Sequence, residues 1–171
     1  MNEWNRRVND KNTKNFRYLI AYLLDDLPVG AQFKPSVLHI SILPWFALET
    51  DEEPFIKWFY DHFDQIQVFE ATVGEQRMFG PKKDVPVNII DPAAKFLELH
   101  NLALSWFGKV GARWAERDPY VGKDYVPHIA QRRGFVLNVG EKLPISSLTL
   151  FKASRHEDHI RTVAAKALFH E

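Results

Sequence analysis

The alternation of apolar and less apolar side chains is clearest in residues 38–43. A period of two is typical of a β-strand, because successive side chains of a strand point to opposite faces. We expect this strand to end at Pro44, since proline cannot donate to a sheet ladder. His39 and Ser41 then project from one face, and three apolar side chains project from the other: Leu38, Ile40 and Ile42.

Apolar runs between turn-forming residues predict further strands. They cover residues 17–24, 67–73, 85–90, 135–139 and 147–152, with a short strand around His128. Apolar spacings of three and four predict helices. These begin at a capping box in residues 50–53, at Asp91-Pro92, and at a second capping box in residues 154–157 whose helix carries residues 160–168. Because strands and helices mix without strict β-α-β repetition, we predict an α+β domain of mainly antiparallel strands.

Length and composition limit the function classes that need to be considered. The chain has 171 residues, 46% of them hydrophobic, which suffices for one domain with a core. We assign residues 16–171 to that domain and the polar residues 1–15 to an N-terminal arm. The 22 basic and 22 acidic residues balance, so no net charge attracts nucleic acid or an anionic membrane. The absence of cysteine excludes a disulfide, a thiolate nucleophile and a zinc site built on cysteine.

The sequence also predicts where the protein resides and what it needs. The apolar stretch of residues 18–24 is too short to span a bilayer, and nothing before it resembles a secretory signal. We therefore expect a cytoplasmic monomer with no membrane contact, no cofactor and no metal ion. His100 lies beside the apolar face of a predicted helix and is expected to be structural.

A second histidine stands in a context similar to that of His39. Residues 126–130 read Val-Pro-His-Ile-Ala, so a small residue, Ala130, stands two positions after His128. The two histidines are 89 residues apart (128 − 39), which predicts one in each half of the domain. Acid–base phosphoryl transfer needs two such groups, one to take a proton from the nucleophile and one to donate a proton to the leaving oxygen.

These two segments resemble the repeated histidine motif of the 2H phosphoesterase superfamily, which includes 2′-5′ RNA ligases and RNA 2′,3′-cyclic phosphodiesterases. The aromatic residue and the proline before His128 are similar to the second motif of that family, and Arg133 falls where an arginine often follows. The resemblance covers roughly residues 16–153. It departs from the family at Ala130, where the family has serine or threonine.

The resemblance implies a two-lobed fold with a central cleft, in which His39 and His128 face each other across a phosphate as acid and base. Ser41 is implied to hold a non-bridging phosphate oxygen. An alanine side chain cannot donate a hydrogen bond, so the second contact must come from Arg132 or Arg133, a backbone N–H or a water.

The implied activity is hydrolysis, without a metal ion, of a 2′,3′-cyclic phosphate or a 2′-5′ linkage in an RNA end or a small nucleotide. Trp114 and Tyr120 either stack on a base of that substrate or pack against the core. The alternative is a protein of the same fold that binds nucleotides or RNA without turnover, because Ala130 removes an oxyanion donor.

Overall fold

The computed structural model describes residues 15–109, 111–114, 120–132, 137–154, 156–157 and 159–171. In chain order these residues form β1 (Phe16–Leu23), β2 (Gln32–Phe33), β3 (His39–Leu48), α2 (Glu52–Phe63), β4 (Phe69–Phe79), β5 (Val85–Asp91), α3 (Ala93–Phe107), β6 (Ala112–Trp114), the 3₁₀ turn η1 (Gly122–Asp124), β7 (His128–Ala130), β8 (Lys142–Ile145), β9 (Ser147–Ser154) and β10 (Arg161–Leu168).

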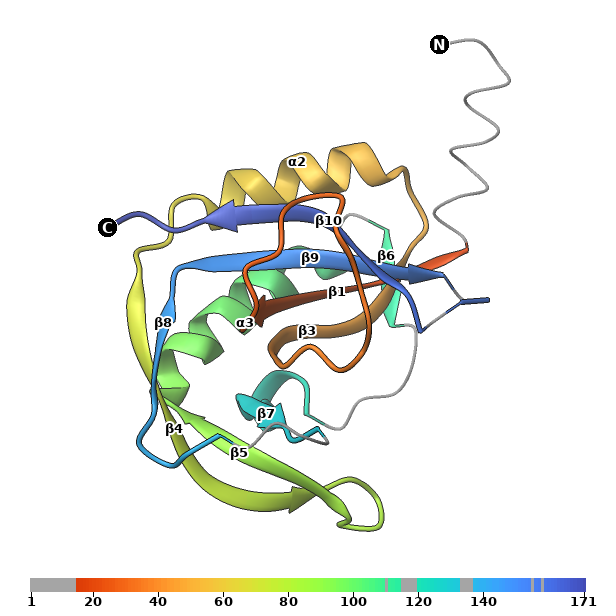
Figure 1. Ribbon diagram of the computed structural model, residues 1–171. Coiled ribbons are helices and arrows are strands. Elements are labelled where there is room, and N and C mark those ends of the chain that lie inside the picture. The colour runs from red at the N-terminus through yellow and green to blue at the C-terminus, as the bar shows by residue number, and fades with distance from the viewer. Residues whose placement is uncertain (1–14, 110, 115–119, 133–136, 155, 158) are drawn as a thin grey trace, which may run out of the picture.

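Two antiparallel sheets organise the molecule (Figure 1). The larger has the strand order β2-β10-β9-β1-β3-β6, and the smaller has the order β7-β5-β4-β8. Residues of β3 and β7 lie close together, so the two sheets meet at the strands that begin with His39 and His128. The predicted α+β class with two antiparallel lobes is confirmed.

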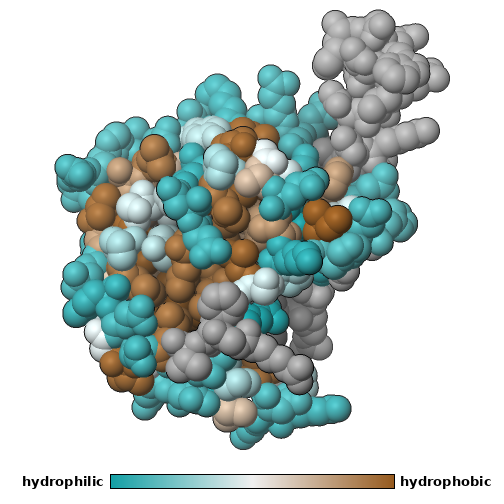
Figure 2. Space-filling model, in the orientation of Figure 1, coloured by the Kyte–Doolittle hydropathy of each residue, from teal (hydrophilic) through white to brown (hydrophobic). Residues whose placement is uncertain are grey.

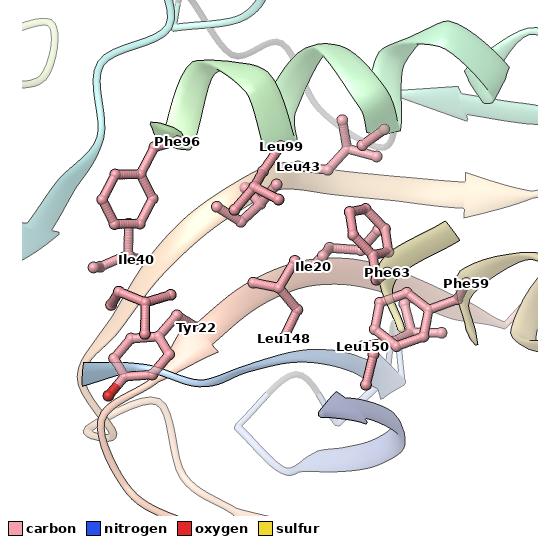
Figure 3. Close-up of a cluster of buried hydrophobic side chains, with 14 of the residues drawn as sticks. Ile20, Tyr22, Ile40, Leu43, Phe59, Phe63, Phe96, Leu99, Leu148 and Leu150 are labelled. Carbon is pink, nitrogen blue, oxygen red and sulfur yellow. The ribbon is translucent and has the colours of Figure 1, made fainter. Parts of the chain in front are cut away.

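The main core lies on the helix-covered side of the larger sheet and continues onto the smaller one. Ile40 of β3 lies beside Phe96 of α3 (Figure 3). Ile20 of β1 and Phe59 of α2 belong to the same buried cluster. Burying side chains of this size contributes about 1.5–3 kcal/mol each relative to leaving them exposed. The apolar stripe predicted for α3 is buried as expected: Phe96, Leu99, Ala103 and Trp106.

A smaller apolar cluster lies on the opposite side of the larger sheet. It is covered in part by the segment between β1 and β3, and the space-filling view shows hydrophilic residues around the rim of this side and apolar residues nearer its middle (Figure 2). Because successive strand residues point to opposite faces, His39 shares this side with the cluster. Its buried members are Leu19, Ala21, Leu23, Phe33, Phe151 and Val163.

The strand that carries His39 is longer than predicted, since β3 continues past Pro44 to Leu48. Its pairing with β1 shifts register between the Ile20–Leu43 and Tyr18–Phe46 pairs, which inserts one extra residue into β3. Proline is tolerated at such an irregularity, because no ladder hydrogen bond is required of it there. Pro44 therefore bends the strand and does not end it.

The helix predicted for residues 160–168 is wrong, because this segment is the strand β10. It pairs with β9 on one side and β2 on the other. Side chains along it alternate between buried and half-buried, beginning with buried Arg161 and Val163. The alanines of this segment favour a helix, but pairing with an already buried strand outweighs that preference. Ser154, the predicted helix cap, accepts instead a hydrogen bond from the His156 backbone N–H in a turn.

Two predicted helix starts also differ in detail. The residue before α2 is Asp51, one position after Thr50 of the predicted box, and its side chain makes no capping hydrogen bond. Glu52 instead accepts hydrogen bonds from the Tyr18 hydroxyl at 2.6 Å and from Lys152 Nζ at 2.9 Å. Asp91 is the last residue of β5 and does not cap α3, which begins at Ala93 after Pro92.

The predicted N-terminal arm lies outside the described residues except for Asn15. Of the apolar run predicted as a strand at residues 135–139, the structure describes residues 137–139, and these do not form a strand. Within the described part of the chain, no helix has the length and apolar character needed to cross a bilayer.

Candidate active site

β3 presents His39 and Ser41 on the side of the larger sheet that faces away from the helices. The His39 ring stands edge-on to Phe151, with 6.0 Å between ring centroids. Its Nδ1 lies 3.3 Å from the carbonyl oxygen of Val37. Because a carbonyl oxygen only accepts, Nδ1 carries the proton and Nε2 is the basic nitrogen of this ring.

β7 presents His128 in an equivalent setting. Across the ladder to β5, His128 pairs with Ile89 and Ala130 pairs with Val87, and Ile129 between them is fully buried in the main core. His128 Nδ1 lies 2.7 Å from the carbonyl oxygen of Val126. Each histidine therefore donates Nδ1–H to the carbonyl two residues before it, which fixes the same tautomer in both rings.

The surroundings of His39 make its imidazole hard to protonate. Burial, offset in part by the hydrogen bond to Val37, lowers the pKa of His39 to about 4, and the positive charges of Arg161, Arg132 and His128 lower it further. His39 is therefore neutral at pH 7. His128 is thus close enough to act electrostatically on His39 where β3 and β7 approach each other.

Arg161 is a residue of this site that the sequence did not reveal. It is the first residue of β10 and is 7% exposed. Its guanidinium carbon lies 5.0 Å from the centre of the Trp45 ring and 5.6 Å from that of Phe151, the ring that also contacts His39. The predicted helix hid this position, although the adjacent β-branched residues Thr162 and Val163 were a signal for a strand.

The fold has known counterparts. The structure of E. coli LigT complexed with 3′-AMP has a TM-score of 0.56 at 12% identity, and the comparison covers 92% of this chain and 99% of that one. TT0787 of Thermus thermophilus has a TM-score of 0.60 at 19% identity, covering 90% of this chain and 97% of that one. A structure described as a phosphoesterase has a TM-score of 0.60 at 14% identity, with coverages of 91% and 99%.

The chain has the fold of these three proteins. At sequence level no family model matches it, and no curated protein matches it.

Within this fold, the predicted phosphate contacts have different positions. Ser41 is half-buried on the His39 face of β3. Ala130 is half-buried on the same face of β7 as His128. Arg132 is exposed, yet its charge reaches His39. Arg133 lies outside the described residues.

The two predicted base-stacking residues differ in their surroundings. Trp114 stacks on Phe107 of α3, with 4.1 Å between centroids, and so packs against the core. Tyr120 stacks on Phe79 at 4.6 Å, and the same two rings flank His128 at 6.0 and 4.8 Å. An aromatic surface thus borders His128.

A cavity of about 470 Å³ lies elsewhere, around the ends of β1 and β10. Its lining includes Tyr22, Asp26 and Lys166 but neither of the two histidines. We give the histidine junction more weight than this cavity, because the junction gathers the groups capable of proton transfer and anion binding.

Proposed function

We propose that this protein is a phosphoesterase that hydrolyses 2′,3′-cyclic phosphates or 2′-5′ linkages of RNA ends or small nucleotides, with His39 and His128 as its proton-transfer pair. The observation that carries the proposal is the equivalent setting of the two histidines. Each stands on a strand at the junction of the sheets, and each has Nδ1 held by the carbonyl two residues earlier. Two prepositioned basic nitrogens at one place are what acid–base catalysis needs.

We assign the roles of the two rings from the surroundings of His39. The lowered pKa of His39 keeps it neutral, so its Nε2 takes a proton from the attacking water as the new oxygen–phosphorus bond forms. His128, as the imidazolium, donates a proton to the ester oxygen when its bond to phosphorus breaks. The products are a phosphomonoester and a free hydroxyl. His39 then releases its proton to solvent and His128 takes one up, which restores the starting state for the next turnover.

Positive charge for the phosphate comes from several elements. Arg132 and Arg161 both influence His39 electrostatically, and a guanidinium can hold two phosphate oxygens at once. We assign a third contact to the Ser41 hydroxyl. Arg161 adds positive charge near His39, whereas the Ala130 side chain offers the phosphate no donor.

The aromatic surface beside His128 suggests the kind of substrate. A base stacked on Phe79 and Tyr120 places a nucleotide next to the ring that protonates its leaving oxygen. E. coli LigT, which has the same fold, is described as complexed with 3′-AMP. A nucleotide with a terminal cyclic phosphate fits both observations.

The decisive experiment is an assay of the purified protein on the four nucleoside 2′,3′-cyclic monophosphates and on a 2′-5′-linked dinucleotide. We expect turnover that falls at least a hundredfold in His39→Ala and in His128→Ala, while His62→Ala, a histidine on the exposed surface of α2, retains full activity. Turnover that persists in both site variants would contradict the proposal.

The alternative function is phosphate or nucleotide binding without turnover, and Ala130 is the observation that favours it. This alternative predicts that the wild type binds a nucleoside monophosphate in a calorimetric titration but turns over none of the substrates above.

A further inference from the structure

A buried imidazole joins the strand of His39 to the segment that leads to His128. His100 of α3 is fully buried, and its Nδ1 lies 2.6 Å from the carbonyl oxygen of Ile42 on β3. Its Nε2 accepts the backbone N–H of Gly122 at 2.9 Å. Because the carbonyl can only accept and the N–H can only donate, the ring is neutral with its proton on Nδ1. One side chain thus bridges the larger sheet and the loop before β7.

Tyr125 makes a second link at the same place. Its ring stacks on His100, with 4.1 Å between centroids and an angle of 9° between the planes. Its hydroxyl donates to the carbonyl oxygen of Ser41 at 2.8 Å. Burial raises the pKa of Tyr125, so the hydroxyl keeps its proton and remains a donor. Tyr125 precedes His128 by three residues, and Ser41 follows His39 by two.

The position of these links explains why they are needed. β6 pairs only with residues 46–48 of β3, so among the described residues no strand covers the same edge of β3 at residues 39–45. Backbone carbonyls on such an edge must find other partners. Water satisfies a carbonyl without fixing the edge to anything, whereas the His100 ring and the Tyr125 hydroxyl attach it to the other lobe.

We propose that His100 and Tyr125 are positioning residues that hold the strands of His39 and His128 at the spacing at which both rings reach one phosphate. This inference rests on the proposed function. Neither residue touches the reacting atoms, so their loss acts on the geometry of the histidine pair. Because a misplacement of about 1 Å can cost on the order of a hundredfold in rate, a change confined to these links is expected to lower kcat more than it raises KM.

Tyr125→Phe is the most conservative variant, because it keeps the stacked ring and removes only the donor to Ser41. Tyr60→Phe is its matched control, since the Tyr60 hydroxyl also bonds a backbone group of the larger sheet, the N–H of Lys166, away from β3. We expect kcat on a 2′,3′-cyclic nucleotide to fall about tenfold to a hundredfold in Tyr125→Phe, with KM changed less than about threefold. An equal kcat in the two variants overturns the proposal.

A pair of His100 variants separates its two hydrogen bonds. His100→Asn keeps a donor near the place of Nδ1, toward Ile42, and loses the acceptor for Gly122. His100→Gln keeps an acceptor near the place of Nε2 and loses the donor. If both bonds contribute to the spacing, both variants lower kcat. A wild-type kcat in His100→Asn would remove the bond to Gly122 from the proposal, and a wild-type kcat in His100→Gln would remove the bond to Ile42.

A readout without turnover keeps this test separate from that of the proposed function. The ring-proton NMR signals of His39 and His128, with and without inorganic phosphate, are compared in wild type, Tyr125→Phe and Tyr60→Phe. We expect both signals to move in Tyr125→Phe and neither to move in Tyr60→Phe. Unmoved signals in Tyr125→Phe contradict the positioning role. A wild type that hydrolyses nothing contradicts the proposed function, and the NMR signals then still decide whether the links position the rings.

Discussion

At the scale of single residues, His39 and His128 share a tautomer but differ in what surrounds them. His39 is packed against Phe151 on the apolar side of the larger sheet, and cationic groups from β7, β10 and the segment after β7 act on it. Burial without a compensating anion disfavours the imidazolium. In the reaction that we propose, the phosphate of the substrate supplies that anion and makes His39 a better proton acceptor.

The lowered pKa of His39 predicts an acid-dependent loss of stability. Above its unfolded pKa of 6.5 the group is neutral in both states. As the pH falls from 6.5 to about 4, His39 binds a proton in the unfolded chain but not in the folded protein. The free energy of unfolding should therefore fall over this window by up to about 3 kcal/mol from this group alone. Urea unfolding of wild type and His39→Gln at several pH values measures it. If the free energy of unfolding changed equally with pH in both proteins between pH 6.5 and 4, the lowered pKa of His39 would be contradicted.

The Ala130 position gives a second prediction at this scale. Ala130 shares a face of β7 with His128, so Ala130→Ser places a hydroxyl beside the same phosphate. A charge-assisted hydrogen bond is worth roughly 1.5–3 kcal/mol, so we expect hydrolysis of a cyclic phosphate to rise about tenfold or more. The rates of Ala130→Ser and of Ala130→Val, which adds bulk without a donor, are compared with wild type. No gain in Ala130→Ser would mean that another group, such as Arg161, already holds that oxygen.

At the scale of elements, β10 determines which charge reaches the site. As a helix, residues 160–168 would have carried Arg161 on their first turn. As a strand paired with β9 and β2, they place it on the His39 side of the larger sheet, against Trp45 and Phe151.

We therefore predict that Arg161→Gln raises KM for a cyclic nucleotide about tenfold to a hundredfold, the equivalent of one charge-assisted contact to phosphate. Arg77→Gln is the charge-matched control, because Arg77 is exposed on β4 and pairs with Glu75. The measurement is KM for the substrate together with the dissociation constant of inorganic phosphate. Equal values in the two variants would remove Arg161 from the site.

At the scale of the whole molecule, the site exists because two sheets meet along strands far apart in the sequence. α3 packs against both sheets, and the groups that join them, His100 and Tyr125, bond the edge of β3. The neutral total charge is no obstacle to anion binding, since cationic groups from three parts of the chain converge on His39.

The chemistry proposed for the whole molecule predicts that activity survives chelation. In the described part of the chain, no group of three or more histidine, aspartate or glutamate side chains is arranged to hold a metal ion. The two histidines can supply both proton transfers. Turnover after dialysis against EDTA should stay within about twofold of that of the untreated enzyme. A loss that zinc or manganese restores would show that a metal ion takes part.

The sequence by itself determined the two histidine strands and the apolar stripe of α3. Both rest on local periodicity: His39-x-Ser41 alternates with apolar residues, and α3 repeats apolar residues at helical spacing. The spacing of the two similar histidine segments predicted one histidine in each half of the domain, while the two lobes and the class of chemistry that we propose were implied by the resemblance to the 2H phosphoesterases.

Tertiary structure alone decided three things. It extended β3 through Pro44, because the register shift there leaves a position at which no backbone N–H is needed for the ladder. It made residues 161–168 a strand, because a neighbouring strand offered backbone partners and a buried face that outweigh the helix preference of alanine. It also brought Arg161 within electrostatic reach of His39 and placed His100 between Ile42 and Gly122. These pairs lie 122 (161 − 39), 58 (100 − 42) and 22 (122 − 100) positions apart in the chain, and no local pattern encodes such distances.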